Sequence, residues 1–241
     1  MAIKASDNFK IYQNPNGPSI GTLTRKVIEK DGLYFKDIDG TGEVTKVNDW
    51  RIPAKERAAA YAETLTVEEK IGQLTQYNAN LLIKTDAKLT GPVIRTDTDE
   101  KCLQLIGNVL NFRSAEEMRL IQKRHLETDP NHIPIMFMMD VIHGYRTIYP
   151  IPLALGCSFD ANLVEECSRM AAKEAASSGV QVTFAPMVDY VRDARWGRVM
   201  ESCGEDNLVN SVMGAAQVRA FQGENLKDPE HIACCVKHFA A

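Results

Sequence analysis

The sequence contains no long apolar run and no block of like charges. No stretch approaches the roughly 18 consecutive apolar residues of a membrane span, and the opening MAIKASDNFK lacks the apolar segment of a secretory signal. The formal charge of the 241 residues is only -4 at pH 7, with no run of about five or six like charges. We therefore expect no membrane and no nucleic-acid partner, and a cytoplasmic location, with a secreted form as the alternative.

Motifs for metals and for nucleotide phosphates are also missing. The six cysteines form no Cys-x-x-Cys pair and the histidines form no His-x-x-x-His pair, so the thiols are interpreted as reduced packing residues. There is no G-x-G-x-x-G turn and no P-loop. Residues 37–48 nearly match a calcium loop, but Asn48 stands where the bidentate Glu belongs, which favours a plain Asp-Gly turn over bound calcium. We expect no metal and no cofactor.

The character of the chain changes near residue 65. Residues 1–65 are polar and rich in turns, with one short strand-like run from Gly32 to Phe35, and we expect an N-terminal arm there. Residues 66–241 show a regular alternation of helical and strand-like segments. With 44% hydrophobic and 25% charged residues, the sequence has the balance of an ordinary globular protein.

Helix and strand signals alternate along this second part. Helices are expected after two capping boxes, Thr66 with Glu69 and Ser114 with Glu117, and within 160–179 and 206–223. The segments between them are near-continuous apolar runs, which is typical of parallel strands covered by helices on both faces. The strand-like runs are Leu103–Leu110, IPIMFMMD, VQVTFAPMVDY and IACCV.

Two α/β architectures fit this alternation: a closed (β/α)8 TIM-type barrel and an open doubly wound sheet. The open sheet usually has a glycine-rich phosphate turn after its first strand, and none is present. The four or five expected strands are roughly half of those that a barrel needs. Both architectures place functional groups at the carboxyl ends of their strands.

Charged residues follow three successive strand-like runs. Asp140 follows the first, the segment 192–198 follows the second, and Lys237 with His238 follows the third. A carboxylate grips a vicinal diol, and arginine and lysine donate to the hydroxyl lone pairs, so the set suits a sugar better than a phosphate. Trp196 could pack on a sugar face, although a loop-anchoring role is at least as well supported.

At these positions the sequence resembles glycoside hydrolase family 3, the retaining β-glucosidases and their relatives. The matching segments, in order, are KIGQLTQ, MMDVIHGYRTIYPIPLALG, FAPMVDYVRDARWGRVMESCGED and VKHFAA, from about Thr66 to the last residue. The resemblance implies that residues 66–241 are the N-terminal portion of the family's catalytic barrel. The combination of RWGR with KHF is specific, whereas either motif alone is weak.

The resemblance also implies roles for five residues. Asp140 would hold hydroxyls of the sugar next to the cleaved bond, and Arg198, Lys237 and His238 would line the same subsite. Arg146 matches a second ligand-facing position of some family members. Lys237 and His238 are neighbours, so the strand must end or bulge at Val236 for both to reach one ligand.

The other charged residues and histidines of the region are interpreted as structural or surface residues. Arg192 and Arg195 could form ion pairs with Asp193 and Glu201 that shape the loop. His143 would only brace backbone carbonyls. His125 and His132 are expected at the surface.

The sequence departs from the family pattern in one respect. The resemblance implies a nucleophilic aspartate in a Ser-Asp-Trp type segment and an acid/base from a later domain, and neither is found in these 241 residues. We therefore expect a piece of an enzyme, roughly half a barrel, whose open edge is covered by the remaining part or by a second copy.

Two functions remain open at this point. One is an exo-acting retaining β-glycosidase, most directly a β-glucosidase with β-xylosidase as the alternative within the family, whose 241-residue chain alone is inactive. The other is a non-catalytic carbohydrate-binding or assembly protein derived from the same fold.

Overall fold

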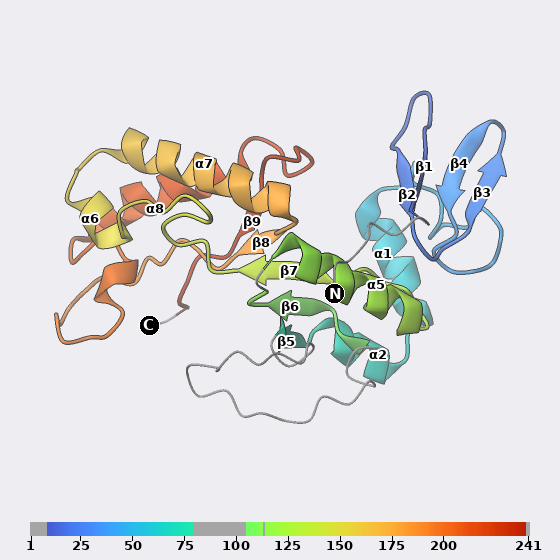
Figure 1. Cartoon of the computed structure of the whole chain (residues 1–241), viewed down its shortest axis with the longest axis horizontal. Helices are drawn as coiled ribbons and strands as arrows, with labels where there is room; N and C mark the ends of the chain where they lie inside the picture. Colours follow the sequence, from blue (N-terminus) through green and yellow to red (C-terminus); the bar gives the residue numbers. More distant parts are fainter. Residues whose placement is uncertain (1–8, 80–104, 113, 240–241) are drawn as a thin grey trace. The chain divides into compact units, whose positions relative to one another are not determined.

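The computed structural model describes residues 9–79, 105–112 and 114–239 (Figure 1). The chain divides into two compact units, one formed by residues 1–109 and 116–135 and the other by residues 110–115 and 136–241. Within the described residues, no helix is long and apolar enough to cross a membrane.

The first unit begins with two antiparallel hairpins. Strand β1 (Lys10–Tyr12) pairs with β2 (Ile20–Thr22), and β3 (Val27–Lys30) pairs with β4 (Leu33–Lys36), which confirms the strand expected near Gly32–Phe35. Asp31 and Gly32 both have positive φ, 53° and 73°, as a two-residue turn between twisted strands requires. The separation of residues 1–65 as an arm stays a prediction.

The segment 37–48 is closed by its own side chains. The Asn48 amide donates to Asp39 Oδ1 at 2.7 Å and to the Glu43 carbonyl at 2.8 Å, and the Thr45 hydroxyl donates to Asp39 Oδ2 at 2.5 Å. This network is that of a hydrogen-bonded turn. Among the described residues, no group of three His, Cys, Asp or Glu side chains is placed to hold a metal ion.

Among the described residues, three helices and two short strands follow the hairpins in this part of the chain. The capping box of Thr66 and Glu69 is present at the start of α2, as predicted. The elements are α1 (Ala54–Thr64), α2 (Val67–Gln73), β5 (Gln76–Asn78), β6 (Asn108–Leu110) and α5 (Ala115–Thr128). The predicted run 103–110 starts outside the described residues, and its second half forms β6.

One expectation about α5 is wrong. His125, expected at the surface, is fully buried, and its Nε2 lies 2.7 Å from the Ile133 carbonyl oxygen. The loop after the helix folds back over the ring, so a position that looks polar in the sequence becomes part of the interior. His132 is half-buried, with Nδ1 2.5 Å from the Leu126 carbonyl oxygen.

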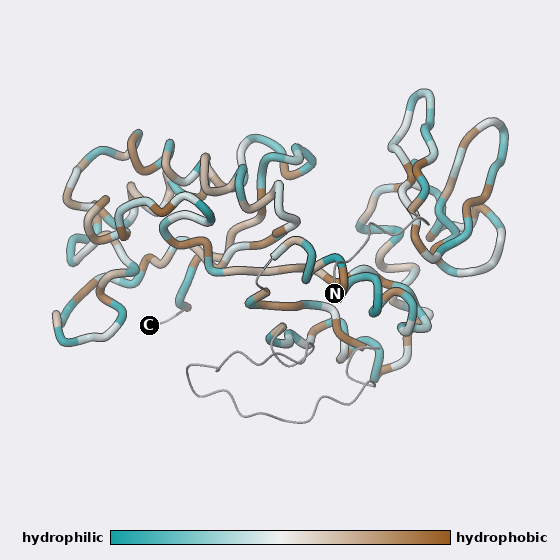
Figure 2. Tube along the Cα trace, in the orientation of Figure 1, coloured by the Kyte–Doolittle hydropathy of each residue, from teal (hydrophilic) through white to brown (hydrophobic). Residues whose placement is uncertain are grey.

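The second unit is an α/β layer built on three parallel strands. Strand β8 (Val182–Thr183) lies between β7 (Met136–Met139) and β9 (Ala233–Cys234), with Met139 opposite Thr183 and Thr183 opposite Cys234. Figure 2 shows the tube in brown tones along β7, in keeping with its sequence MFMM. The predicted parallel strands are confirmed, although each is shorter than its apolar run.

Two long helices of this unit pack against each other (Figure 1). Helix α7 (Ala161–Ser178) starts at Asp160, whose side chain accepts two backbone N–H groups, and ends at Gly179 in the left-handed conformation. Helix α8 (Asn207–Gln222) is capped by Asp206, whose side chain accepts one backbone N–H group, that of Val209. Both helices match their predicted bounds. Short α6 (Pro152–Gly156) and the 3-10 turn η1 (Val199–Glu201) complete the unit.

Candidate functional site

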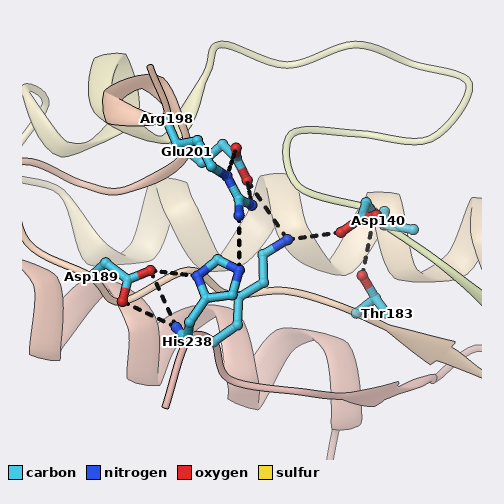
Figure 3. A network of polar contacts seen from close by, with 8 residues as sticks. Asp140, Thr183, Asp189, Arg198, Glu201 and His238 are labelled. Atoms are coloured by element: carbon cyan, nitrogen blue, oxygen red, sulfur yellow. Dashed lines mark hydrogen bonds and ion pairs between the residues drawn. The ribbon is translucent and has the colours of Figure 1, made fainter. Parts of the chain in front are cut away.

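Loops at the carboxyl ends of β7, β8 and β9 carry a connected set of charged side chains (Figure 3). Asp140 directly follows β7, and the chain beyond it is held by a hydrogen bond from Val141 N–H to the Thr183 hydroxyl at 3.0 Å. The loop after β8 supplies Asp189, Arg198 and Glu201, and the segment after β9 supplies Lys237 and His238. We call these six residues, Asp140, Asp189, Arg198, Glu201, Lys237 and His238, the charged network.

The end of β9 explains how two neighbouring residues reach the same site. The strand ends at Cys234, before Val236, as predicted. Beyond it, Lys237 N–H donates to the Pro186 carbonyl at 3.0 Å and the Lys237 carbonyl accepts from Val188 N–H at 2.8 Å. The peptide bond between Lys237 and His238 is cis. The backbone is thus fixed against the β8 loop while both side chains join the charged network.

Lys237 links the loops after β7 and β8. Its ammonium lies 2.8 Å from Asp140 Oδ1 and 3.7 Å from Glu201 Oε2, and its side chain is only 10% exposed. A nearly buried ammonium needs such partners, because an unpaired buried charge is strongly destabilising. Asp140 is 43% exposed and keeps part of its carboxylate open to solvent.

Arg198 and Glu201 form a two-pronged ion pair. Arg198 Nε lies 2.5 Å from Glu201 Oε1 and its NH2 lies 2.6 Å from Oε2. This planar fork is the geometry in which guanidinium and carboxylate bind most strongly. The bonds from Arg198 hold the pKa of the Glu201 carboxyl below its ordinary value and raise the pKa of Arg198. Glu201 is therefore a carboxylate near neutral pH.

His238 is held from two sides. Its backbone N–H donates to both oxygens of Asp189, at 3.1 and 3.2 Å, and its ring Nδ1 lies 2.7 Å from Asp189 Oδ2. Its Nε2 lies 3.0 Å from Arg198 NH1. Asp189 itself is only 7% exposed and lies in the loop that follows β8.

A cavity of about 200 Å³ lies beside the charged network. Asp140 and Glu201 form one part of its lining, so two carboxylate side chains border the space together. The rest of the lining is His143, Gly144 and a largely apolar group formed by Ile142, Ile148, Ile151 and Met200. The cavity is smaller than the roughly 300–1,000 Å³ of pockets for drug-sized ligands and suits one small polar molecule.

The predicted site residues are not all brought together. Asp140, Arg198, Lys237 and His238 form one network, whereas Arg146 is exposed and its backbone N–H donates to Glu174 Oε2 at 3.0 Å. Among the described residues, no hydrogen bond or ion pair connects the Arg146 side chain with the network. Its role in ligand binding stays a prediction.

The remaining loop residues mostly shape the backbone. Arg195 pairs with Asp193, and Arg192 stacks on the Tyr190 ring at 4.9 Å, as structural contacts within the loop. His143 Nδ1 lies 3.1 Å from the Tyr149 carbonyl oxygen, the expected bracing contact, and His143 also lines the cavity. Trp196 is 38% exposed.

Sequence reasoning missed Asp189 and misjudged the partner of Glu201. Glu201 was expected near Arg192 and Arg195, but it pairs with Arg198, three residues before it. That spacing is the signal that could have identified the pair, because residues three apart face each other on a helical turn. Asp189 carries no comparable signal, since its partner lies 49 residues away in sequence.

The chain belongs to glycosyl hydrolase family 3: residues 66–241 match the model of the Glycosyl hydrolase family 3 N terminal domain. This confirms the resemblance seen in the sequence and the assignment of an α/β barrel domain, of which the described residues form part. Its relatives in this family include proteins named as β-glucosidases and as β-xylosidases.

Three similar proteins, two found by sequence and one by structure, illustrate these relationships. The chain is 38% identical over 177 residues to a periplasmic beta-glucosidase of Salmonella typhimurium, covering 73% of this chain and 22% of that protein. It is similar to the crystal structure of a beta-glucosidase from Listeria innocua in complex with isofagomine, with a TM-score of 0.71 and 44% identity over 78% of this chain and 26% of that one. A relative from Dickeya chrysanthemi, 27% identical over 91% of this chain and 36% of that protein, is named a periplasmic beta-glucosidase/beta-xylosidase. The chain thus spans about a quarter to a third of the length of these relatives.

The Glu201 pair predicts a pH-dependent contribution to stability. A folded-state pKa below the unfolded one, about 4.3 for Glu, means that ionised Glu201 stabilises the chain above that pH and loses this effect as pH falls through the lower folded value. Glu201→Gln should therefore lower the free energy of unfolding near pH 7, and the difference from wild type should shrink towards about pH 3. Urea unfolding across this range measures it, and a difference that stays constant with pH would contradict the assignment.

Proposed function

We propose that the chain is the sugar-binding part of an exo-acting retaining β-glycosidase, most directly a β-glucosidase that removes terminal non-reducing β-D-glucosyl residues. The observation that carries the proposal is the charged network beside the cavity, in a chain of glycosyl hydrolase family 3. The names of the Salmonella and Listeria relatives support the glucoside as substrate.

The chemistry of the network fits the polar edge of a sugar. The partly exposed carboxylate of Asp140 can accept hydrogen bonds from two neighbouring hydroxyls, while the N–H groups of Lys237 and Arg198 can donate to hydroxyl oxygens. Each of these groups is already fixed by an ion pair, so little side-chain entropy is lost on binding. His238 completes the set, and Arg146 is proposed as a further, more distant contact.

The apolar lining of the cavity fits the same ligand. A pyranose has C–H surfaces as well as hydroxyls, and Ile142, Ile148 and Met200 face the space that the two carboxylates border. Sites for small molecules commonly combine apolar walls with a few convergent polar groups. This combination separates the site from a phosphate site, which would need cations without the carboxylates.

The network is suited to holding a sugar and not to breaking its bond. A retaining glycosidase needs a nucleophile and a protonated acid about 5 Å apart. The pKa of Glu201 is lowered by Arg198, so Glu201 carries no proton to donate, and Asp140 is paired with Lys237. We propose that the nucleophile and the acid/base come from other parts of a longer protein or from another chain, which would also cover the open edge of the sheet.

Because Asp140 and Glu201 are both held in ion pairs, the site also fits a second candidate, a non-catalytic carbohydrate-binding protein. A panel of nitrophenyl glycosides assayed with the protein at its natural length separates the two. Hydrolysis of the β-glucoside in preference to the β-xyloside supports the proposal. Hydrolysis of the xyloside alone would show that the enzyme is a β-xylosidase. Sugar binding without hydrolysis of any glycoside supports the second candidate.

We also propose a cytoplasmic location. All five described cysteines are free thiols, which fits a reducing compartment, although two of the relatives above are named as periplasmic. Fractionation of the source cells with an antibody against this chain tests the location, and recovery from the periplasm would refute it.

A further inference from the structure

Both ring nitrogens of His238 already have protein partners. Nδ1 faces the Asp189 carboxylate at 2.7 Å, and Nε2 faces the Arg198 guanidinium at 3.0 Å (Figure 3). The ring therefore joins a buried carboxylate to an arginine.

The chemistry of the two partners dictates where the ring proton lies. A guanidinium only donates hydrogen bonds, so Nε2 must be the unprotonated, accepting nitrogen. An ionised carboxylate only accepts, so Nδ1 must carry the hydrogen that points to Asp189. A second hydrogen on Nε2 would face the N–H of Arg198, so the geometry fits the neutral imidazole in one tautomer only.

We propose that Asp189 is a positioning residue that fixes His238 in the Nδ1–H tautomer and thereby makes Nε2 an acceptor that orients Arg198. Asp189 is equipped for this role because its two oxygens also accept the backbone N–H of His238, so both the main chain and the ring are fixed by one carboxylate. The Asp189 side chain is only 7% exposed, so water competes little for its carboxylate oxygens.

The orientation of the Arg198 guanidinium determines which of its N–H groups stay available to a ligand. Glu201 takes Nε–H and one N–H of NH2, and His238 takes one N–H of NH1. Three of the five N–H groups of Arg198 are used in these contacts, which fixes its plane and leaves one N–H on each terminal nitrogen for a ligand. That these two groups meet a sugar rests on the proposed function, whereas the tautomer of His238 does not.

The test is the ring-nitrogen spectrum of His238 in the 241-residue chain without any sugar. Long-range ¹H–¹⁵N correlation distinguishes a protonated from an unprotonated ring nitrogen, and His238→Gln identifies the signals of this residue among only five histidines. At about pH 8, where an ordinary imidazole is neutral, we expect Nδ1 protonated and Nε2 unprotonated in the wild type. A dominant Nε2–H tautomer, or an even mixture, would overturn the proposal.

Asp189→Asn then asks whether the carboxylate is the cause. The carboxamide has the same shape, but when its oxygen accepts the backbone N–H of His238, its NH₂ faces Nδ1 and forces that nitrogen to accept. We expect most of the population to change to the Nε2–H tautomer, as an amide in place of a carboxylate does in serine proteases. An unchanged tautomer in a folded variant would refute the role of Asp189.

Two further variants complete the design. Asp193→Asn is the matched control, because Asp193 lies in the same loop and contacts Arg195 but not His238, and it should leave the tautomer unchanged. Arg198→Met removes the donor to Nε2 but leaves Asp189 in place, so the Nδ1–H tautomer should persist. A switch in Arg198→Met would show that Arg198, and not Asp189, sets the tautomer, and this holds even if Asp189→Asn does not fold.

Discussion

Replacing Asp140 with Ala should lower kcat/KM for an aryl β-glucoside by about a hundredfold or more, measured in a protein of natural length that carries this chain. The expected loss arises because Asp140 would hold two sugar hydroxyls by charge-assisted hydrogen bonds, each worth about 1.5–3 kcal/mol. The structure adds a second cause, since the substitution also removes the closest partner of the nearly buried Lys237 ammonium, at 2.8 Å.

Asp193→Ala is the control for this measurement. Asp193 is also an aspartate near the site, but it is exposed and pairs with Arg195 within its own loop. It should change kcat/KM by less than about twofold, as an exposed ion pair contributes little. A loss below about fivefold for Asp140→Ala, with the fold intact by circular dichroism, would contradict the assignment of Asp140 to the sugar.

The parts of the fold that could be predicted are those with local signals. Asp160 and Gly179 mark the two ends of α7 through a side-chain cap and a left-handed residue, and both act within a few residues. The continuous apolar runs identified β7, β8 and β9 and their parallel arrangement. Strand lengths were overestimated, because backbone pairing ends well before the apolar residues do.

For the site, the sequence predicts which residues follow a strand but not which side chains contact each other. That Asp140, Arg198, Lys237 and His238 follow strands is visible in the sequence, and parallel strands bring such positions to one edge. Which of them touch is not visible: Lys237 pairs with a residue 97 positions away. The burial of His125 was missed for the same reason, since it depends on how the following loop closes over the ring.

The 241-residue chain by itself should show no turnover of β-glucosides. Without a nucleophile no glycosyl-enzyme intermediate can form, and without a proton donor the leaving oxygen must depart as an alkoxide. Glu201 cannot supply that proton, because its bonds to Arg198 keep its pKa low. Binding a sugar at the charged network would stabilise only the ground state, which lowers no barrier.

The assay is release of nitrophenol from an aryl β-glucoside by the purified chain, with mass spectrometry to exclude a contaminating glucosidase. Clear turnover that disappears in Asp140→Asn would show that the charged network itself contains the catalytic carboxylates. In that case the division between residues that hold the sugar and residues that cleave it would be wrong.

The central claim, that the charged network holds a sugar, is tested most directly by titrating glucose into the 241-residue chain and following the side-chain ¹H–¹⁵N signals of Arg198. We predict saturable shifts of these signals with a Kd of about a millimolar or weaker, because the cavity is open to water, and their loss in Asp140→Asn. Asp193→Asn should bind as the wild type does. Shifts that persist unchanged in Asp140→Asn, or no response of Arg198 at concentrations about a hundredfold above a millimolar, would contradict the account.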